Sequence, residues 1–269
     1  GSEMCIRDRE EGLAAGLLAR RLPDGTLLMN VYGWSPGGRD YASYVFRSRD
    51  NGLTWGEPSL IAEGFNETAL LVLPDGRVLA FLRDGLGTHQ SVSTDGGYTW
   101  SKPREILGRG FHPADAILLQ DGSILLTTGH RLEPFGVFAT VSRDMGKSWE
   151  VDKGVLLEWN SLDADCGYPS SVQLDDGTIV TIYYGVKHKV WADLDRYAIC
   201  VRYKAVPMSL PSGIDGEGRA KTSPAQCPVA YPPLASIEGG EFSGFLPLDG
   251  GGKVGVTGRE VRSERVRRR

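Results

Sequence analysis

A motif of the form S-x-D-x-G-x-[ST]-W occurs three times in this chain. The copies are Ser48–Trp55, Ser93–Trp100 and Ser142–Trp149, and their aspartates lie 45 and 49 residues apart. An internal period of about 40–50 residues is typical of a β-propeller, in which each repeat forms one blade. We therefore expect an all-β fold of consecutive blades, with equivalent residues of each repeat placed around one central opening.

A second repeated signal is an Asp-Gly pair between two apolar, β-prone runs. It occurs at Asp24-Gly25, Asp75-Gly76, Asp121-Gly122 and Asp176-Gly177. Such a pair predicts a tight hairpin in which both turn residues take positive φ. Each repeat therefore reads as a strand, an Asp-Gly turn, a strand, a loop, a strand, the Asp motif and a short strand.

The two signals together divide the chain into repeats and flanking segments. We expect blades at 12–62, 63–107, 108–158 and 159–206. Since six blades are common for this repeat, the chain is expected to be the C-terminal two-thirds of a propeller that lacks about two N-terminal blades. Residues 1–11 read as a non-native leader, because they resemble translated sequencing-adapter sequence. Residues 207–269, rich in Pro, Gly and Ser with a basic end, are predicted to be a disordered tail.

Composition excludes several classes of function. The net charge of −4 gives no global basic field for nucleic acid, and no apolar run reaches the roughly 18–20 residues of a membrane helix. Neither cysteines nor histidines show metal or redox spacing, so we expect no cofactor and no metal site. They are Cys5, Cys166, Cys200, Cys227, His89, His112, His130 and His188. Compartment and oligomeric state stay open.

The Asp motif itself is expected to be structural, because it recurs in every repeat. Its Ser and Asp can bond the backbone of a tight turn, its Gly supplies positive φ, and its Trp can pack between blades. Functional residues should instead differ between repeats. Glu67 lies eight residues before Asp75 and Tyr168 eight before Asp176, and the same offset gives Gly16 and Pro113. Different chemistry at one structural address, the start of the innermost strand, indicates a site built onto the fold.

The Asp motifs and Asp-Gly hairpins of residues 12–206 resemble the sialidase superfamily, whose members carry BNR or Asp-box repeats. Three segments are similar to its bacterial exo-α-sialidase-like proteins: Phe65–Gly76, Phe111–Asp115 and Gly167–Tyr184. The resemblance implies a six-bladed propeller that removes terminal sialic acids from glycans with retention of configuration. The expected partner is thus a sialylated or other glycan substrate.

The resemblance makes Tyr168 the nucleophile and Glu67 the base that takes its proton. A sialic acid carries a carboxylate on its anomeric carbon, so a carboxylate nucleophile would be repelled and a neutral phenol would not. Because a free tyrosine has a pKa near 10, it needs such a neighbouring base.

The substrate carboxylate calls for forked arginine donors. Arg83, at the end of the second strand of its repeat, matches one clamping arginine of the family, and Arg131 is a second candidate. His112 and Asp115 are expected to contact sugar hydroxyls, although His112 could also be an ordinary loop histidine. Relatives often carry an arginine where this chain has Phe138, which leaves the third clamping residue unassigned.

Some elements of the family's site are not identifiable. Asp163 and Asp165 precede Tyr168 and either reach the pocket or form a solvated turn. The general acid and the first clamping arginine belong to the first blades, so the isolated chain is expected to be nearly inactive. Two alternatives stay open: a glycosidase or lyase of the same fold that acts on another sugar, for example another acidic one, and a non-catalytic propeller that binds carbohydrate or protein. The Glu67–Tyr168 pair favours an enzyme.

Overall fold

The computed structural model describes residues 14–15, 18–34, 40–190, 193–204, 243–247 and 253–257. The expected leader and Gly16 lie outside the described residues, as does most of 207–269. In the described ranges the regular structure is β, apart from one 3₁₀ turn, η1 (Val151–Lys153). These ranges contain no helix long and apolar enough to cross a membrane.

The strands form four antiparallel sheets in chain order. The first contains β1 (Ala14–Ala15), β2 (Arg20–Arg21), β3 (Leu27–Trp34), β4 (Tyr41–Ser48) and β5 (Gly56–Glu63). The second contains β6 (Thr68–Val72), β7 (Val78–Arg83), β8 (Thr88–Ser93) and β9 (Arg104–Leu107). The third contains β10 (Phe111–Leu118), β11 (Ile124–His130), β12 (Gly136–Ser142) and β13 (Val155–Glu158). The fourth contains β14 (Gly167–Gln173), β15 (Ile179–Val190) and β16 (Asp193–Tyr203), and a separate pair is formed by β17 (Ser243–Pro247) and β18 (Lys253–Thr257).

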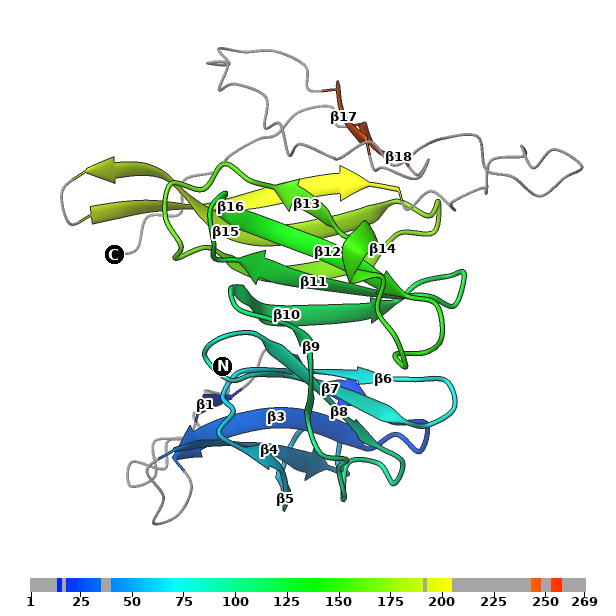
Figure 1. Cartoon of the computed structure of the whole chain (residues 1–269). Helices are drawn as coiled ribbons and strands as arrows, with labels where there is room; N and C mark the ends of the chain where they lie inside the picture. Colours follow the sequence, from blue (N-terminus) through cyan, green and yellow to red (C-terminus); the bar gives the residue numbers. More distant parts are fainter. Residues whose placement is uncertain are drawn as a thin grey trace, which may run out of the picture.

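Each sheet after the first packs against the preceding sheet through its own first strand. Strand β6 contacts β2 and β3, β10 contacts β6, β7 and β8, and β14 contacts β10, β11 and β12. The sheets accordingly lie one on another in sequence order, from the blue first sheet to the yellow-green fourth (Figure 1). This is the arrangement of consecutive propeller blades, which confirms the expected all-β, partial-propeller fold with four blades.

The core lies between the blades. Leu28 and Val45 of the first blade pack with Leu70 and Val78 of the second, and similar buried clusters join the second blade to the third and the third to the fourth. Strand β7 is buried along almost its whole length. Burial on both faces explains why these strands read as nearly continuous apolar runs.

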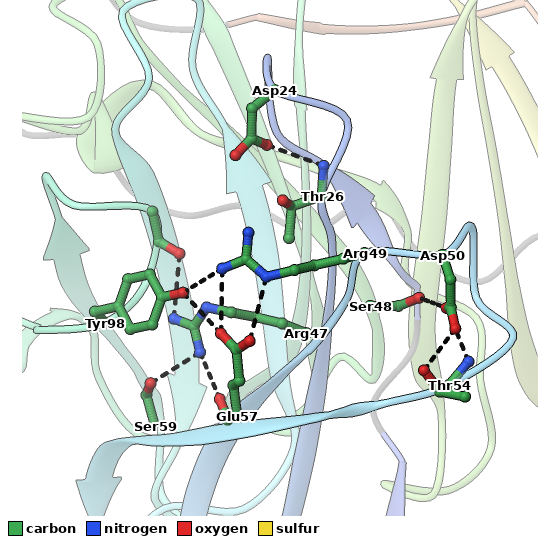
Figure 2. A network of polar contacts seen from close by, with 11 residues as sticks. Asp24, Thr26, Arg47, Ser48, Arg49, Asp50, Thr54, Glu57, Ser59 and Tyr98 are labelled. Atoms are coloured by element: carbon green, nitrogen blue, oxygen red, sulfur yellow. Dashed lines mark hydrogen bonds and ion pairs between the residues drawn. The ribbon is translucent and has the colours of Figure 1, made fainter.

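The Asp-Gly hairpins form where predicted, but with a different turn. Gly25, Gly76, Gly122 and Gly177 have φ of 80–90°, whereas the preceding aspartates do not have positive φ. The expectation of two positive-φ residues was therefore wrong. At the first hairpin Gly25 N donates to Leu22 O over 2.9 Å, and Asp24 Oδ1 accepts the Thr26 N–H over 2.9 Å (Figure 2). This is a three-residue loop, a type I turn followed by a left-handed glycine, in which the aspartate acts through its side chain.

The Asp motifs form identical turns. In the first, Asp50 accepts hydrogen bonds from Ser48 Oγ (2.7 Å) and Thr54 N (2.8 Å) (Figure 2). Ser48 Oγ in turn accepts the Gly52 N–H over 2.8 Å. The other two copies repeat these bonds. Burial raises the pKa of these aspartates, but the hydrogen bonds that they accept from hydroxyl and backbone N–H groups lower it by more. The pKa of all three is therefore about 2.

Residues beside the Asp motifs also join neighbouring blades. Arg47 lies 3.7 Å from the centre of the Tyr98 ring and donates to Gly96 O of the second blade over 3.2 Å. Figure 2 shows Glu57 between Arg49 and Tyr98, whose hydroxyl donates to it over 2.8 Å. The Asp-motif rim, meaning the three Asp motifs, these joining residues and Arg104, which donates to Gly146 O of the third motif, is thus a dense polar network with a structural role. Within it, Nε of Arg47 is buried without a partner among the described residues.

Candidate active site

Glu67, Arg83 and Tyr168 converge from two blades. Glu67 directly precedes β6, Arg83 is the last residue of β7, and Tyr168 is the second residue of β14. The Tyr168 hydroxyl donates a hydrogen bond to Glu67 Oε1, and Arg83 Nη1 donates to Glu67 Oε2. Arg83 Nη1 also lies 3.5 Å from the Tyr168 oxygen. The structure therefore brings together the two residues proposed for catalysis and the first clamping arginine, while their roles stay predictions.

Tyr168 is held in an unusual state. Its φ is 51°, in the left-handed region that non-glycine residues rarely adopt, and it follows Gly167 with φ of 106°. Such a conformation persists only where surrounding contacts impose it, and it is common at active sites. Burial, followed by the hydrogen bond to Glu67, raises the pKa of Tyr168 to about 12. The resting phenol is thus protonated, with its proton directed at a carboxylate.

Several arginine donors near Tyr168 have no hydrogen-bond partner among the described residues. Arg131, one residue beyond β11 rather than at its end, has its guanidinium carbon 5.7 Å from the centre of the Tyr168 ring. Its Nε and Nη2 are buried without a partner, as is Nε of Arg83. A buried unsatisfied donor costs about 1–3 kcal/mol, and more when it is charged. These nitrogens are suited to an anion that would satisfy them.

His112 adds a neutral group to the same region. It is buried, and its Nδ1 has no partner within the described ranges. Burial, then the positive charges of Arg83 and Arg131, lower its pKa to about 4. His112 is therefore an uncharged imidazole at neutral pH, in the field of both arginines.

Asp115 is occupied elsewhere. Its Oδ2 accepts the Ser171 N–H over 2.8 Å, and its Oδ1 lies 3.5 Å from Arg20 Nη2. Arg20 in turn donates to Leu70 O over 2.7 Å. These contacts link the first strands of all four blades, β2, β6, β10 and β14. Because Asp115 is almost fully buried among protein partners, its expected role in contacting sugar gives way to a structural one.

Two other sequence candidates also lie outside the polar cluster. Phe138 is buried and packs edge-to-face on Phe111, with ring centres 4.9 Å apart, so this position belongs to the core. Asp165 accepts hydrogen bonds from the Tyr184 hydroxyl and from Arg196. Asp165 thus bonds the hydroxyl of Tyr184, whose ring packs on Tyr168, while its own side chain is 36% exposed.

The sequence reasoning missed Tyr184 and Tyr32. Tyr184 stacks on Tyr168, with ring centres 5.7 Å apart and an angle of 26° between the rings. Burial, then the charge of Glu67, raises the pKa of Tyr32, and the charge of Arg83 opposes this rise. Tyr32 therefore lies within electrostatic reach of Glu67 and Arg83. The signal was present: eight residues after the turn aspartates of the four repeats come Tyr32, Arg83, Gly129 and Tyr184. The strands on both sides of these hairpins have one end at the mouth, but the offset of eight residues was applied only to the strand before the turn.

The described residues contain no group of three His, Cys, Asp or Glu side chains that could hold a metal ion. What they bring together is a proton donor, a carboxylate and two arginines. We call Glu67, Arg83, His112, Arg131 and Tyr168 the mouth cluster.

Comparison with known proteins places the fold. Residues 12–182 match the model of the BNR repeat-like domain. No curated protein matches the chain by sequence. Among solved structures, a protein of unknown function from Dyadobacter fermentans is 28% identical over 68% of this chain and 51% of its own, with a TM-score of 0.57.

Two solved enzymes are also similar. A Hadza microbial sialidase is 22% identical over 64% of this chain and 35% of its own, with a TM-score of 0.52. An α-L-arabinofuranosidase from Fusarium graminearum is 20% identical over 73% and 63%, with a TM-score of 0.54. At these identities the likeness shows the fold alone. The chain spans about half the length of the Dyadobacter protein and a smaller share of the sialidase.

Proposed function

The chain belongs to the BNR repeat-like domain family, and from this premise we propose that it is part of a glycan-active propeller that hydrolyses terminal sialic acids. The observation that carries the proposal is the hydrogen bond from the Tyr168 hydroxyl to Glu67. Tyrosine as a glycosidase nucleophile is the known exception that suits an anionic sugar.

In the proposed reaction the Tyr168 oxygen attacks the anomeric carbon as the bond to the leaving alcohol breaks. Glu67 Oε1 takes the phenol proton during the attack, because a pKa of about 12 leaves almost no free phenolate at neutral pH. Arg83 stabilises the carboxylate before the transfer and the tyrosine oxygen during it. The leaving oxygen takes a proton from solvent water. A second water then attacks the glycosyl-tyrosine intermediate and releases its proton to solvent, while Glu67 returns the proton it holds to the departing phenolate.

The unsatisfied arginine nitrogens support an acidic sugar as substrate. Arg131 Nε and Nη2, with Arg83 Nε, could bond a carboxylate and recover the cost of their burial. Counting Arg83 and Arg131 against Glu67, the cluster carries a net charge of +1, because His112 is neutral. A neutral sugar could accept these hydrogen bonds through its hydroxyl oxygens but would leave the net positive charge uncompensated.

The nucleophile can be tested on this chain without a general acid. A fluorinated sialosyl fluoride loses fluoride, which needs little protonation, and leaves a slowly hydrolysed covalent adduct. Intact-mass and peptide mass spectrometry should find one sugar on Tyr168, and Tyr168→Phe should reduce adduct formation by at least about 10³-fold. Tyr203→Phe is the matched control, because its hydroxyl contacts Thr181 in the core.

An adduct on another residue, or equal labelling of Tyr168→Phe, would show that the assigned nucleophile is wrong. Absence of labelling in a wild-type chain that binds sialic acid would favour a binding propeller instead. We expect Tyr168→Phe to retain sialic acid binding within about threefold, because the phenol hydroxyl contributes to chemistry more than to the ground state.

His112 favours a second candidate, elimination on a uronic acid polysaccharide. A neutral imidazole beside two arginines could remove the proton next to a carboxylate that those arginines neutralise. A polysaccharide lyase is among the matched structures, at 12% identity, where the likeness shows only the fold. In the elimination His112 takes the proton next to the carboxylate, the C–O bond to the leaving sugar breaks, and the leaving oxygen takes a proton from water. The product carries a conjugated double bond, which absorbs in the ultraviolet, and its formation depends on His112. Labelling of Tyr168 without that absorbance would exclude this candidate.

A further inference from the structure

Three aromatic side chains form a continuous strip on the first blade. Trp34 and Tyr41 stack with ring centres 4.6 Å apart and 21° between the rings, and Tyr32 meets Tyr41 edge-on at 6.1 Å. Trp34 ends β3 and pairs with Tyr41, which begins β4. Tyr32 and Trp34 are two residues apart and therefore share one face of the strand.

The strip begins beside the mouth cluster. Tyr32 pairs in register with Ser43, and Ser43 Oγ lies 2.8 Å from Thr68 Oγ1, in the residue that follows Glu67. Tyr32 also holds the same place in its repeat as Arg83, eight residues after the turn aspartate. Blade topology thus puts the end of β3 on the same side of the propeller as the end of β7. The strip runs from there to Trp34.

Its outer part is open to solvent. Trp34 is 50% exposed and Tyr41 38% exposed, although they stack on each other. Single exposed apolar residues need no explanation, but a stacked Trp–Tyr pair continuous with a polar site is a surface that a ligand could cover. The rings carry no charge, in contrast to the arginines of the mouth. Sugar rings present C–H groups on one face, and such faces pack on aromatic rings while their hydroxyls stay hydrated.

We propose that Tyr32, Tyr41 and Trp34 form a binding subsite for the neutral sugar that follows the acidic sugar of a glycan substrate. This inference rests on the proposed function and deepens it. The mouth cluster holds the charged terminal residue, and the strip holds the next pyranose ring. The preferred substrate is then an oligosaccharide chain, not an acidic sugar on a small aglycone.

Calorimetric binding to the 269-residue chain tests the subsite, with sialic acid, sialyllactose and lactose as probes. We expect wild type to bind sialyllactose more tightly than sialic acid, and Trp34→Ala or Tyr41→Ala to weaken sialyllactose about tenfold while sialic acid is unchanged. Trp34→Phe should restore most of the loss, because it keeps a ring. Trp159→Ala is the control, since Trp159 is a 39% exposed tryptophan in the segment that directly follows β13. Thermal unfolding of each variant confirms folding.

Failure of the subsite and of the proposed function give different results. If Trp34→Ala leaves the ratio of the sialyllactose and sialic acid affinities unchanged, the subsite is wrong and the acidic-sugar site stands. If wild type binds neither acidic probe, the proposed function is wrong, and the strip is judged on lactose alone. Lactose binding that does not weaken in Trp34→Ala, or no lactose binding, would then overturn the subsite as well.

Discussion

The Asp-motif rim and the mouth cluster contain similar side chains, but these differ in how far the protein itself satisfies their hydrogen bonds. On the rim, Arg104 Nη2 donates to Gln90 Oε1 and to the carbonyl oxygens of Gly146 and Lys147, all within 2.9 Å. At the mouth, Nε and Nη2 of the half-buried Arg131 are buried and unpaired within the described ranges. Nη2 of Arg104 is thus fully occupied by acceptors of the protein itself, although Nε of Arg47, also on the rim, is buried without a partner in the described ranges. The mouth arginine has donors that only a ligand, or water, could satisfy.

The two regions also differ in whether the same residues recur from blade to blade. The rim repeats one solution three times, with each aspartate bonded by the turn that it closes. The mouth places a different residue at each equivalent position, and one of them, Tyr168, has a strained backbone. Repetition therefore specifies the blade, and departure from repetition marks the candidate functional site. Three experiments can break or sharpen this contrast.

The largest effect is expected when one arginine of each region is replaced by alanine and the two variants are compared. Arg131→Ala should weaken sialic acid binding about 100-fold, or about 2.7 kcal/mol, because it removes a charged fork aimed at the carboxylate. Its stability should change little or improve, since unpaired buried donors are removed. Titration calorimetry and urea unfolding measure the two quantities.

Arg104→Ala is the matched control and should show the reverse pattern. It should lower stability, because Gln90 and two carbonyl oxygens lose their donor, and leave sialic acid binding unchanged. If both variants lose affinity and stability together, the separation between rim and mouth does not hold.

An intermediate effect is expected at the rim carboxylates. Asp95→Ala removes the acceptor of hydrogen bonds from Ser93 Oγ, Tyr98 N and both Thr99 donors, and should cost about 2 kcal/mol of unfolding free energy. Asp75→Ala, at a hairpin where the carboxylate bonds only Arg77, should cost less than about 1 kcal/mol. Urea unfolding compares them. Equal losses would mean that the Asp motif is not a specialised turn.

The sequence predicted the blade well because local chemistry determines it. The Asp-Gly hairpins and Asp motifs form by hydrogen bonds among residues at most a few positions apart, so their pattern is visible in a short window. The exception is instructive: the turn aspartates have ordinary φ and act as side-chain acceptors, as Asp24 does for Thr26. Asp-Gly fits more than one turn, and loop length selected the type.

The mouth was predicted only in part, because its contacts join distant blades. The offset of eight residues brought Glu67 and Tyr168 to one address, but it could not show that Asp115 lies under Arg20 and Ser171. Spacing gives position around the axis and not the partner of a side chain. Tyr184 and Tyr32 could have been found by applying the same offset to the other side of each hairpin.

The smallest effect is a pH window that should separate the two regions. The pKa of His112 is about 4 in the folded chain against 6.5 for the free group, with burial, Arg83 and Arg131 opposing protonation and Glu67 and Asp84 favouring it. Between those values the unfolded chain binds a proton that the folded chain refuses, so stability must fall as pH drops from about 6.5 to 4. The rim aspartates, with pKa values of about 2, lose their contribution only below about pH 4.

We expect His112 to account for about 1 kcal/mol of the loss between pH 6.5 and 4, less than the full shift because water can reach a partly opened mouth. Urea unfolding at several pH values in this range measures it, and His112→Gln, which cannot be protonated, should flatten the profile by that amount. Sialic acid should flatten it as well, because a carboxylate bound by Arg83 and Arg131 would offset the positive charges that oppose protonation of His112. If His112→Gln keeps the wild-type slope, the acid sensitivity comes from elsewhere. The mouth would then be no more sensitive to acid in this range than the rim.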